Sequence, residues 1–165
     1  MLVNIRSVLS GQRQSIPIRY DADFRDYDFY GVRPFPAPVK VDGAIDNSSG
    51  VCMLKLRICA VAETRCASCG KSISVPMDVP VSLMIVSSEP EDEDEAYDIV
   101  VCESGELELD DTVNEAITFA MDLRPLCKED CKGVCFGCGA DLNREPCRCA
   151  PRINPELEKL KDLLF

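Results

Sequence analysis

The chain has 165 residues, of which 46% are hydrophobic, so it can fold as one domain or as one domain with a small appendage, and it is not wholly disordered. It contains no histidine, which excludes Ser–His–Asp and Cys–His catalysis and every metal site that uses histidine. The net charge of −11 is local, because residues 89–111 hold 12 acidic and no basic residues. This block repels phosphate, and it is either a solvated segment or a surface for a basic protein.

Neither a membrane span nor an export signal is expected from the sequence. The longest uncharged apolar run, residues 79–86, is far below the roughly 20 residues that a spanning helix needs. The first residues, Met1 to Arg6, lack a basic start followed by a long apolar stretch and small cleavage residues.

The first half of the chain predicts strands. Residues 1–5 can pair as a strand, and closely spaced prolines at 34–38 predict an extended connection to a strand over 39–45. Residues 51–64 and 72–86 both alternate apolar and polar positions, which predicts a long β-hairpin with a CxxC tip. Pro76 and Pro80 deny the second strand a full hydrogen-bond ladder, so we expect it to lie at an edge, to bend or to be broken.

The second half of the chain predicts an acidic loop, short strands and two helices. Seven acidic residues at 89–98 predict a mobile loop, and short strands are expected over 96–102 and 106–109. The sequence from Thr112 to Glu115 matches a capping box, which predicts a helix that ends before Pro125. A capped start at Asn154 predicts a last helix.

These patterns together predict an α+β fold: an antiparallel β-rich core with a long hairpin, one or two packed helices and a C-terminal Cys-rich zinc module. The expected divisions are a core domain at 1–122 with its acidic loop at 89–98, a zinc-binding module at 123–152 and a C-terminal helix at 153–165.

The 11 cysteines fall into two kinds. Cys52, Cys59 and Cys102 stand alone in apolar, strand-like surroundings, and we expect them to be buried in the core. The other eight are clustered, and clustered thiols in a chain without export signals indicate metal or redox chemistry rather than disulfides.

The spacing of the clustered cysteines predicts two zinc sites. A pair of cysteines two to four residues apart can direct two sulfurs at one tetrahedral ion. One predicted site combines Cys135, Cys138, Cys147 and Cys149 within one compact segment, and the other joins Cys66, Cys69, Cys127 and Cys131 across a long loop. Two alternatives stay open: the pairs exchange partners, or Cys127 and Cys131 either bind no metal or belong to a single rearranged site.

The C-terminal motifs resemble those of a known family. The segments 125–127, 130–135, 138–143 and 147–149 are similar to the tail of the YceD-like proteins, also called large ribosomal RNA subunit accumulation proteins. The upstream Cys66/Cys69 pair, the acidic stretch and the helix at 112–122 fit the same layout, although Phe136 stands where such tails often have proline. The resemblance implies a cytoplasmic bacterial or organellar protein that is needed for accumulation of 23S ribosomal RNA, in a family without established enzymatic activity.

The resulting hypothesis is a non-enzymatic, structural-zinc factor of ribosome biogenesis with no catalytic residues. Its expected partner is a ribosomal protein or a pre-ribosomal large-subunit particle, and direct RNA contact and the oligomeric state stay open. Two other hypotheses are a thiol-disulfide oxidoreductase that uses the CxxC at 66–69 and a nucleic-acid-binding zinc ribbon. The oxidoreductase needs its CxxC at a helix N-terminus, whereas here a strand pattern follows.

Overall fold

The computed structural model describes residues 1–88 and 99–149. The chain divides into two compact units, which we call the core unit (Met1–Thr64 with Ile73–Leu123) and the cysteine unit (Arg65–Ser72 with Arg124–Phe165, described to residue 149). The elements in chain order are β1 Leu2–Asn4, α1 Arg6–Leu9, β2 Ser15–Ala22, β3 Val39–Ser48, β4 Val51–Arg65, β5 Ser72–Val86, β6 Ile99–Val101, β7 Glu106–Glu108 and α2 Leu109–Ala120. The predicted α+β class is confirmed.

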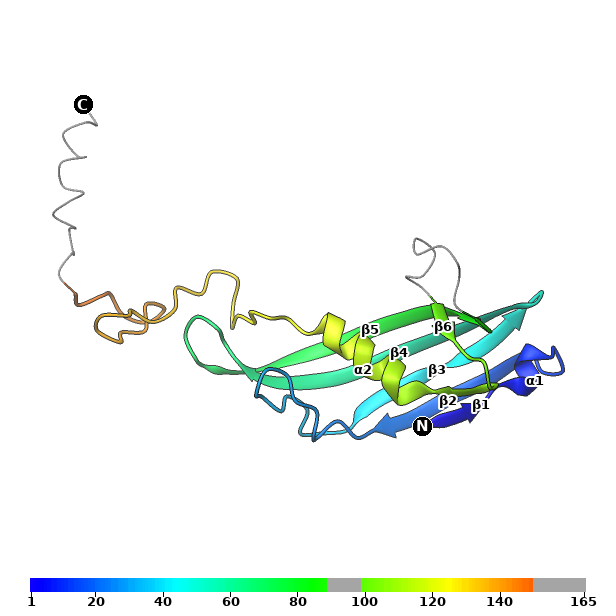
Figure 1. Ribbon diagram of the computed structural model, residues 1–165. Helices are drawn as coiled ribbons and strands as arrows, with labels where there is room; N and C mark the ends of the chain where they lie inside the picture. The colour runs from blue at the N-terminus through cyan, green and yellow to red at the C-terminus, as the bar shows by residue number, and fades with distance from the viewer. Residues whose placement is uncertain (89–98, 150–165) are drawn as a thin grey trace, which may run out of the picture. The chain divides into compact units, whose positions relative to one another are not determined.

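A five-stranded sheet in the order β2-β3-β4-β5-β6 forms the core unit (Figure 1). β2, β3 and β4 pair in antiparallel fashion, with Tyr20 opposite Val41 and Val41 opposite Ile58. β6 runs parallel to β5 and pairs only with its last residues, Met84–Val86. The hairpin predicted at 51–86 is therefore present as β4 and β5, inside a larger sheet.

The alternation in β4 decides which cysteines are buried. Leu54, Leu56 and Ile58 point into the core, whereas the residues between them face solvent. Cys59 falls in the second set and is exposed, so the expectation that it fills the core was wrong. Its period-2 position in the strand outweighs the general preference of cysteine for burial. The same expectation is confirmed for Cys52 and Cys102, which are buried.

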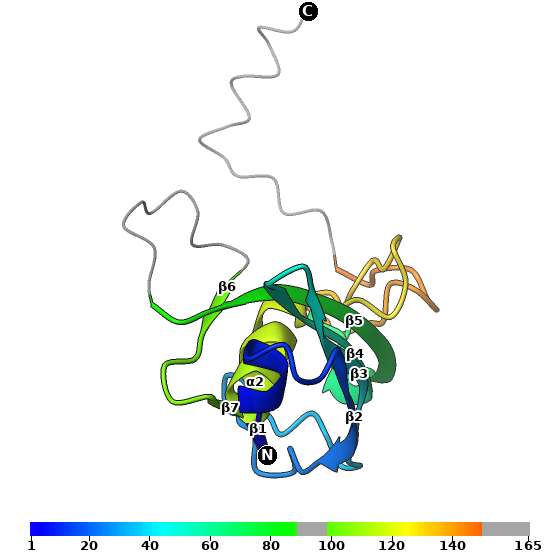
Figure 2. The same cartoon turned by 90° about the vertical axis from the view of Figure 1, so that its right-hand side faces the viewer.

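The helix α2 lies against the concave side of the curved sheet (Figure 2). Val113 and Ile117 have no exposed surface and anchor the helix there. The capping box predicted at Thr112 was wrong, because the helix begins at Leu109 and Thr112 is buried within its second turn. The side chain of Glu108, the last residue of β7, caps the helix by accepting a hydrogen bond from the amide of Asp110.

Two elements, α1 and β2, were not predicted from the sequence, whereas the strands predicted at 1–5 and 106–109 are present as β1 and β7. β7 pairs with β1, and β1 leads directly into α1, a single turn whose Val8 is fully buried. β2 is an outer strand of the large sheet and contains Pro17, as an edge position permits. Both elements are held by partners distant in sequence.

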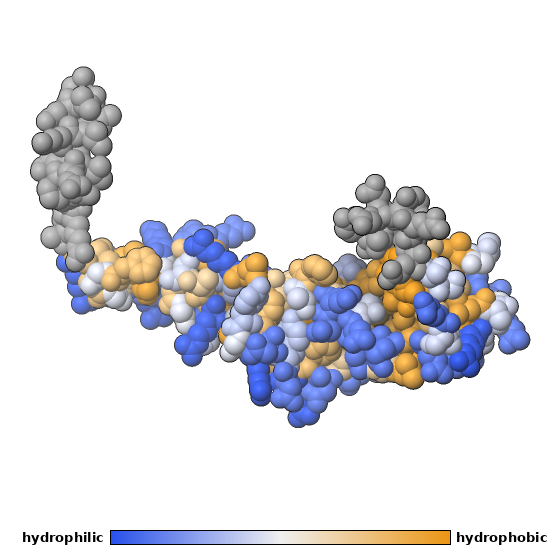
Figure 3. Space-filling model, in the orientation of Figure 1, coloured by the Kyte–Doolittle hydropathy of each residue, from blue (hydrophilic) through white to orange (hydrophobic). Residues whose placement is uncertain are grey.

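β5 is continuous despite its two prolines. Pro76 and Pro80 lie outside the stretch that β6 pairs with, so among the described residues β4 is the only strand beside them. The apolar positions of β5 up to Leu83 are half-buried rather than fully buried. In the view of Figure 3, hydrophobic residues gather around β6, while hydrophilic residues cover much of the remaining surface of the core unit.

The predicted acidic loop at 89–98 and the predicted helix at 153–165 lie outside the described residues. No helix in the described part of the chain is long and apolar enough to cross a membrane.

Candidate metal centres

Eight thiols meet in two groups of four, and both groups lie in the cysteine unit. We call them site 1 (Cys66, Cys69, Cys127 and Cys131) and site 2 (Cys135, Cys138, Cys147 and Cys149). Within each group all sulfur atoms lie within 4.8 Å of one another. Each group can therefore hold a metal ion.

The two CxxCG turns that begin these sites have the same backbone hydrogen bonds. In the first, the amide of Gly70 donates to the carbonyl of Cys66 at 2.8 Å, and the amide of Cys66 donates to the carbonyl five residues later at 2.8 Å. In the second, Gly139 donates to Cys135 at 2.8 Å, and Cys135 donates to the carbonyl five residues later at 2.9 Å. Both glycines have a positive φ, +72° and +71°, which glycine adopts without steric cost. One local structure is thus used twice.

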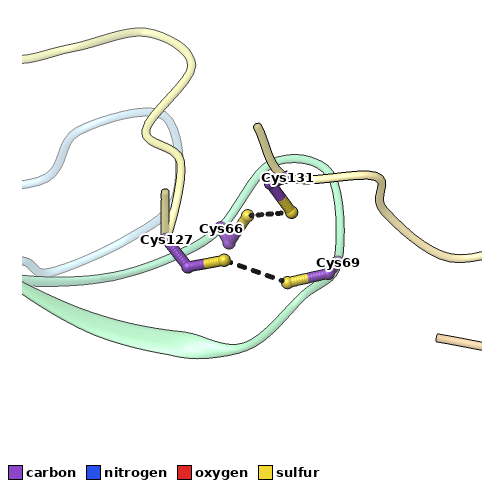
Figure 4. A group of neighbouring side chains, drawn as sticks. All are labelled: Cys66, Cys69, Cys127 and Cys131. Carbon is purple, nitrogen blue, oxygen red and sulfur yellow. Dashed lines mark hydrogen bonds between the residues drawn. The ribbon is translucent and has the colours of Figure 1, made fainter. Parts of the chain in front are cut away.

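Site 1 joins the hairpin tip to a segment about 60 residues further along the chain. Figure 4 shows the four side chains converging, with the sulfur of Cys66 3.7 Å from that of Cys131, and the sulfur of Cys69 3.7 Å from that of Cys127. Two backbone hydrogen bonds hold the segments together: the amide of Ala67 donates to the carbonyl of Pro125, and that of Val134 donates to the carbonyl of Ser68. Site 1 is partly enclosed, since Cys66 is buried and its three partners are half-buried.

Site 2 is local and open to solvent. The sulfur of Cys135 lies 3.3 Å from that of Cys147 and 3.7 Å from that of Cys149, and the sulfur of Cys138 lies 4.0 Å from that of Cys147. The last three cysteines are exposed. Two ligand pairs within one short segment make this site independent of the hairpin.

The sulfur separations match a tetrahedral thiolate site. With metal–sulfur bonds of about 2.3 Å, as for zinc, the sulfurs at the corners of a tetrahedron lie about 3.8 Å apart. Five of the sulfur pairs lie 3.3 to 4.0 Å apart, and all the sulfurs of each group lie within 4.8 Å of one another. Thiolates are also the soft donors that zinc and iron–sulfur clusters prefer.

Backbone amides lower the pKa of Cys66 in site 1 and of Cys135 and Cys138 in site 2. In site 2, the amides of Cys138 and Gly137 lower the pKa of Cys135 to about 6. In site 1, burial raises the pKa of Cys66, but amide donors led by that of Cys127 outweigh burial and lower the pKa to about 6. Such donors stabilise a thiolate, which is the form that binds metal.

In each group, the pKa of two other thiols is raised, that of Cys69 and Cys127 in site 1 and that of Cys147 and Cys149 in site 2. The thiol of Cys131, with burial as the second cause, raises the pKa of Cys127 to about 12. Hydrogen bonds from the other three thiols of site 2, Cys135 foremost, raise the pKa of Cys149 to about 12. Four thiolates at this spacing repel one another, and a divalent cation is the charge that lets all four ionise together.

Two further residues contribute to the sites without being cysteines. The side-chain amide of Asn143 donates to the sulfur of Cys131 at 3.5 Å, and its oxygen accepts from the amide of Lys132 at 3.0 Å. Gly137 leaves room for a sulfur, because a Cβ built on it would lie 2.7 Å from that of Cys149. Spacing rules for metal ligands do not indicate either residue; Asn143 was visible only as part of the motif 138–143.

Comparison with known proteins assigns the family. The family model described as large ribosomal RNA subunit accumulation protein YceD matches residues 54–164. The chain belongs to this family. The matched range contains all eight clustered cysteines, β5 and α2. The description of the YceD family implies a role in accumulation of the RNA of the large ribosomal subunit.

Individual relatives are more distant. An uncharacterized protein of Mycobacterium leprae is 25% identical over 132 residues, which are 78% of this chain and 60% of that protein. Uncharacterized proteins of Mycobacterium bovis and Mycobacterium tuberculosis are each 23% identical over 133 residues, 78% of this chain and 63% of theirs. This chain thus spans about 60% of the length of these relatives. No solved structure gives a significant match.

Proposed function

We propose that this chain is a zinc-binding factor without enzymatic activity that supports accumulation of 23S ribosomal RNA during assembly of the large ribosomal subunit. The observation that carries the proposal is the presence of two four-thiol groups in a chain of the YceD family. The ligands of the two zinc ions would be Cys66, Cys69, Cys127 and Cys131, and Cys135, Cys138, Cys147 and Cys149.

The zinc ions would be structural. Four thiolates complete a tetrahedral coordination shell and leave no position for a water or a substrate. The cysteine unit also has little else to hold it folded: among its described residues, the buried hydrophobic ones are Cys66 and Ala140. Small modules of this kind take their folding free energy from the metal.

Metal analysis of chain purified without chelator tests the zinc sites. We expect two zinc ions per chain, and one ion or none would contradict the two-site proposal. Chelation should unfold the cysteine unit and leave the core unit folded, because the core unit has its own buried apolar cluster. Amide NMR spectra with and without chelator distinguish the two units.

The role in ribosome assembly is tested by deletion and complementation in the source organism. Loss of the chain should lower the ratio of 23S to 16S ribosomal RNA and the amount of free large subunit in sucrose gradients. The wild-type chain should restore both, and a variant with serine at Cys66 and Cys135 should not. Normal 23S levels in the deletion strain would refute the role.

Charge favours a protein partner over RNA. The described residues of the cysteine unit hold seven basic and four acidic side chains, and two zinc ions with eight thiolates would add about −4. The unit would then be close to neutral and a weak phosphate-binding surface. We therefore infer that the partner is a basic ribosomal protein or the pre-ribosomal large-subunit particle, met in the cytoplasm where ribosomes assemble.

The lowered pKa of Cys66 favours one alternative, a thiol-disulfide oxidoreductase, because low-pKa thiols are the reactive ones. Its burial and its three sulfur neighbours argue against that function. Turnover of a disulfide substrate by the zinc-loaded chain, lost in Cys66→Ser, would establish the oxidoreductase and refute the non-enzymatic proposal.

A further inference from the structure

A groove in the core unit lies outside the metal centres. It has a volume of about 600 Å³. On one side it is lined by the segment Tyr27–Tyr30, and on the other by Asn114, Thr118, Phe119, Met121 and Leu123, at the end of α2 and just after it. This volume lies within the range of about 300–1,000 Å³ that is usual for binding sites in proteins.

The rim of the groove displays large apolar side chains to solvent. Phe119 is 90% exposed, Tyr30 81% and Leu123 73%. Phe119 lies on the side of α2 away from the buried Val113 and Ile117, where a helix normally carries polar residues. Clustered exposed aromatic residues mark interaction surfaces on soluble proteins, whereas single exposed ones need no explanation.

The turn that carries Tyr30 is built to hold the aromatic ring outward. The amide and carbonyl of Phe29 bond to the carbonyl and amide of Val32, at 2.8 and 3.1 Å, and Tyr30 and Gly31 between them have φ of +52° and +81°. This is a tight hairpin turn whose first central position favours asparagine, aspartate or glycine. A tyrosine there is strained by about 1 kcal/mol or more. Side chains held at such a cost are concentrated in binding sites.

The wall behind Tyr30 is fixed to both the core and the helix. The ring of Tyr27 packs against Phe24 and Phe35 at centroid distances of 5.8 Å, and its hydroxyl is 2.9 Å from that of Thr118 on α2. Asp28 accepts a hydrogen bond from the amide of Gly31 at 3.0 Å and stabilises the turn. The groove is therefore preformed, which lowers the entropic cost of binding.

The charge around the groove selects a basic partner. Residues 23–33 hold three acidic and two basic side chains, and residues 109–124 hold four acidic side chains and one basic side chain, Arg124. Of the four acids, Asp110 is paired with the N-terminal amino group. The two arginines are already paired, Arg25 with Asp23 and Arg33 with Asp26. Asp28 on the turn, and Glu115 one helical turn before Phe119, therefore supply negative charge without an ion-pair partner among the described residues. Carboxylates and aromatic faces both attract lysine and arginine side chains.

We propose that this groove is the docking site for a basic peptide segment that carries an apolar anchor side chain. The anchor would enter between Tyr30 and Phe119, and flanking lysine or arginine side chains would face the acidic rim. The inference rests on the proposed function, because it names the surface through which the chain would hold a basic ribosomal protein.

The test uses the full zinc-loaded chain and an array of 15-residue peptides that tile the large-subunit ribosomal proteins of the source organism. We expect binding to peptides that combine several lysines or arginines with an apolar residue, and weaker binding as salt rises. In solution, Phe119→Ser and Tyr30→Asn should each lower the affinity of the chain for the selected peptides at least tenfold. Asparagine suits the positive φ of the turn, so the second variant removes the ring without disturbing the fold.

Two further variants separate attraction by the acidic rim from a general effect of removing an exposed aromatic side chain. Asp28→Asn keeps the hydrogen-bond acceptor for Gly31 and should weaken binding and flatten its salt dependence. Phe136→Ser removes an equally exposed aromatic side chain from the cysteine unit and should leave binding unchanged. The inference is overturned if no basic peptide binds, if Phe119→Ser and Tyr30→Asn bind as the wild type does, or if these variants instead abolish binding to a single-stranded RNA or self-association of the chain.

Failure of this inference is distinguishable from failure of the proposed function. If Phe119→Ser and Tyr30→Asn restore 23S ribosomal RNA in the deletion strain as fully as wild type, and bind the same peptides, the docking site falls and the assembly role stands. If the wild-type chain itself restores nothing, the assembly role falls regardless of which peptides bind.

Discussion

Replacing Gly137 by alanine distinguishes a metal ligand from a free thiol without changing any cysteine. Gly137 has no positive φ, so its backbone accepts alanine. The added Cβ would lie 2.7 Å from the sulfur of Cys149 and 4.0 Å from that of Cys135. An ordinary contact between these atoms is about 3.7 Å, so the Cys149 sulfur must move by roughly 1 Å.

The cost of that movement depends on what the sulfur binds. A free thiol turns about its side-chain bonds at a cost of about 1 kcal/mol or less. A zinc ligand is held near 2.3 Å from the ion with a tolerance of about 0.2 Å, so a shift of 1 Å removes it or distorts the whole site. We therefore expect zinc at site 2 to bind about 10–100-fold more weakly, in the range found when the close surroundings of a metal site are disturbed.

Competition with a chromophoric chelator measures this effect on the full chain. In Gly137→Ala, the zinc ion of site 2 should pass to the chelator at a chelator concentration about 10–100-fold lower than in wild type. The zinc ion of site 1 should behave as in wild type. Phe136→Ala, the neighbouring substitution in the same turn, is the matched control, because this side chain is fully exposed and should have no effect. Two zinc ions held as tightly in Gly137→Ala as in wild type would refute Cys149 as a ligand.

Three further predictions follow from single contacts. Cys66→Ser should reduce zinc from two ions to one per chain by elemental analysis, whereas Cys59→Ser, an exposed cysteine outside both groups, should leave two. Gly43→Ala should lower the free energy of unfolding by about 2–4 kcal/mol in urea titrations, because its Cβ would lie 2.0 Å from a carbonyl oxygen of β4; a loss below about 0.5 kcal/mol would contradict the packing of β3 on β4. Burial raises the pKa of Asp110, but hydrogen bonds from the N-terminal amino group and Tyr20 outweigh burial and lower the pKa. The contribution of Asp110 to folding stability is therefore present above about pH 4 and is lost as the pH falls through the lowered pKa. Asp110→Asn should therefore cost about 0.5 kcal/mol at pH 7, a small value for a half-exposed group, and less than that at pH 2. An equal cost at both pH values would contradict the charge interaction.

The candidate metal centres were largely visible in the sequence. Metal-ligand spacing is a local property, and a CxxCG turn brings two sulfurs together through hydrogen bonds within six residues. The long hairpin was visible for a similar reason, since alternation of apolar and polar residues over 15 positions is a local pattern that is typical of a β-strand. The grouping of the Cys66 and Cys69 pair with the Cys127 and Cys131 pair was predicted because these two cysteine pairs were the ones left over. The hydrogen bond from the amide of Ala67 to the carbonyl of Pro125 places the two segments side by side.

Other features depended on contacts that no local pattern encodes. α2 begins at Leu109 rather than after Thr112, because β7 pairs with β1 and leads straight into the helix. Cys59 is exposed because the sheet, not the residue type, decides which face of β4 is covered. The groove exists only where the turn at Tyr30 meets the end of α2, nearly 90 residues later. Periodicity and ligand spacing thus determined the strands and the thiol pairs, whereas helix starts, solvent exposure and the groove were decided by which distant segments pack together.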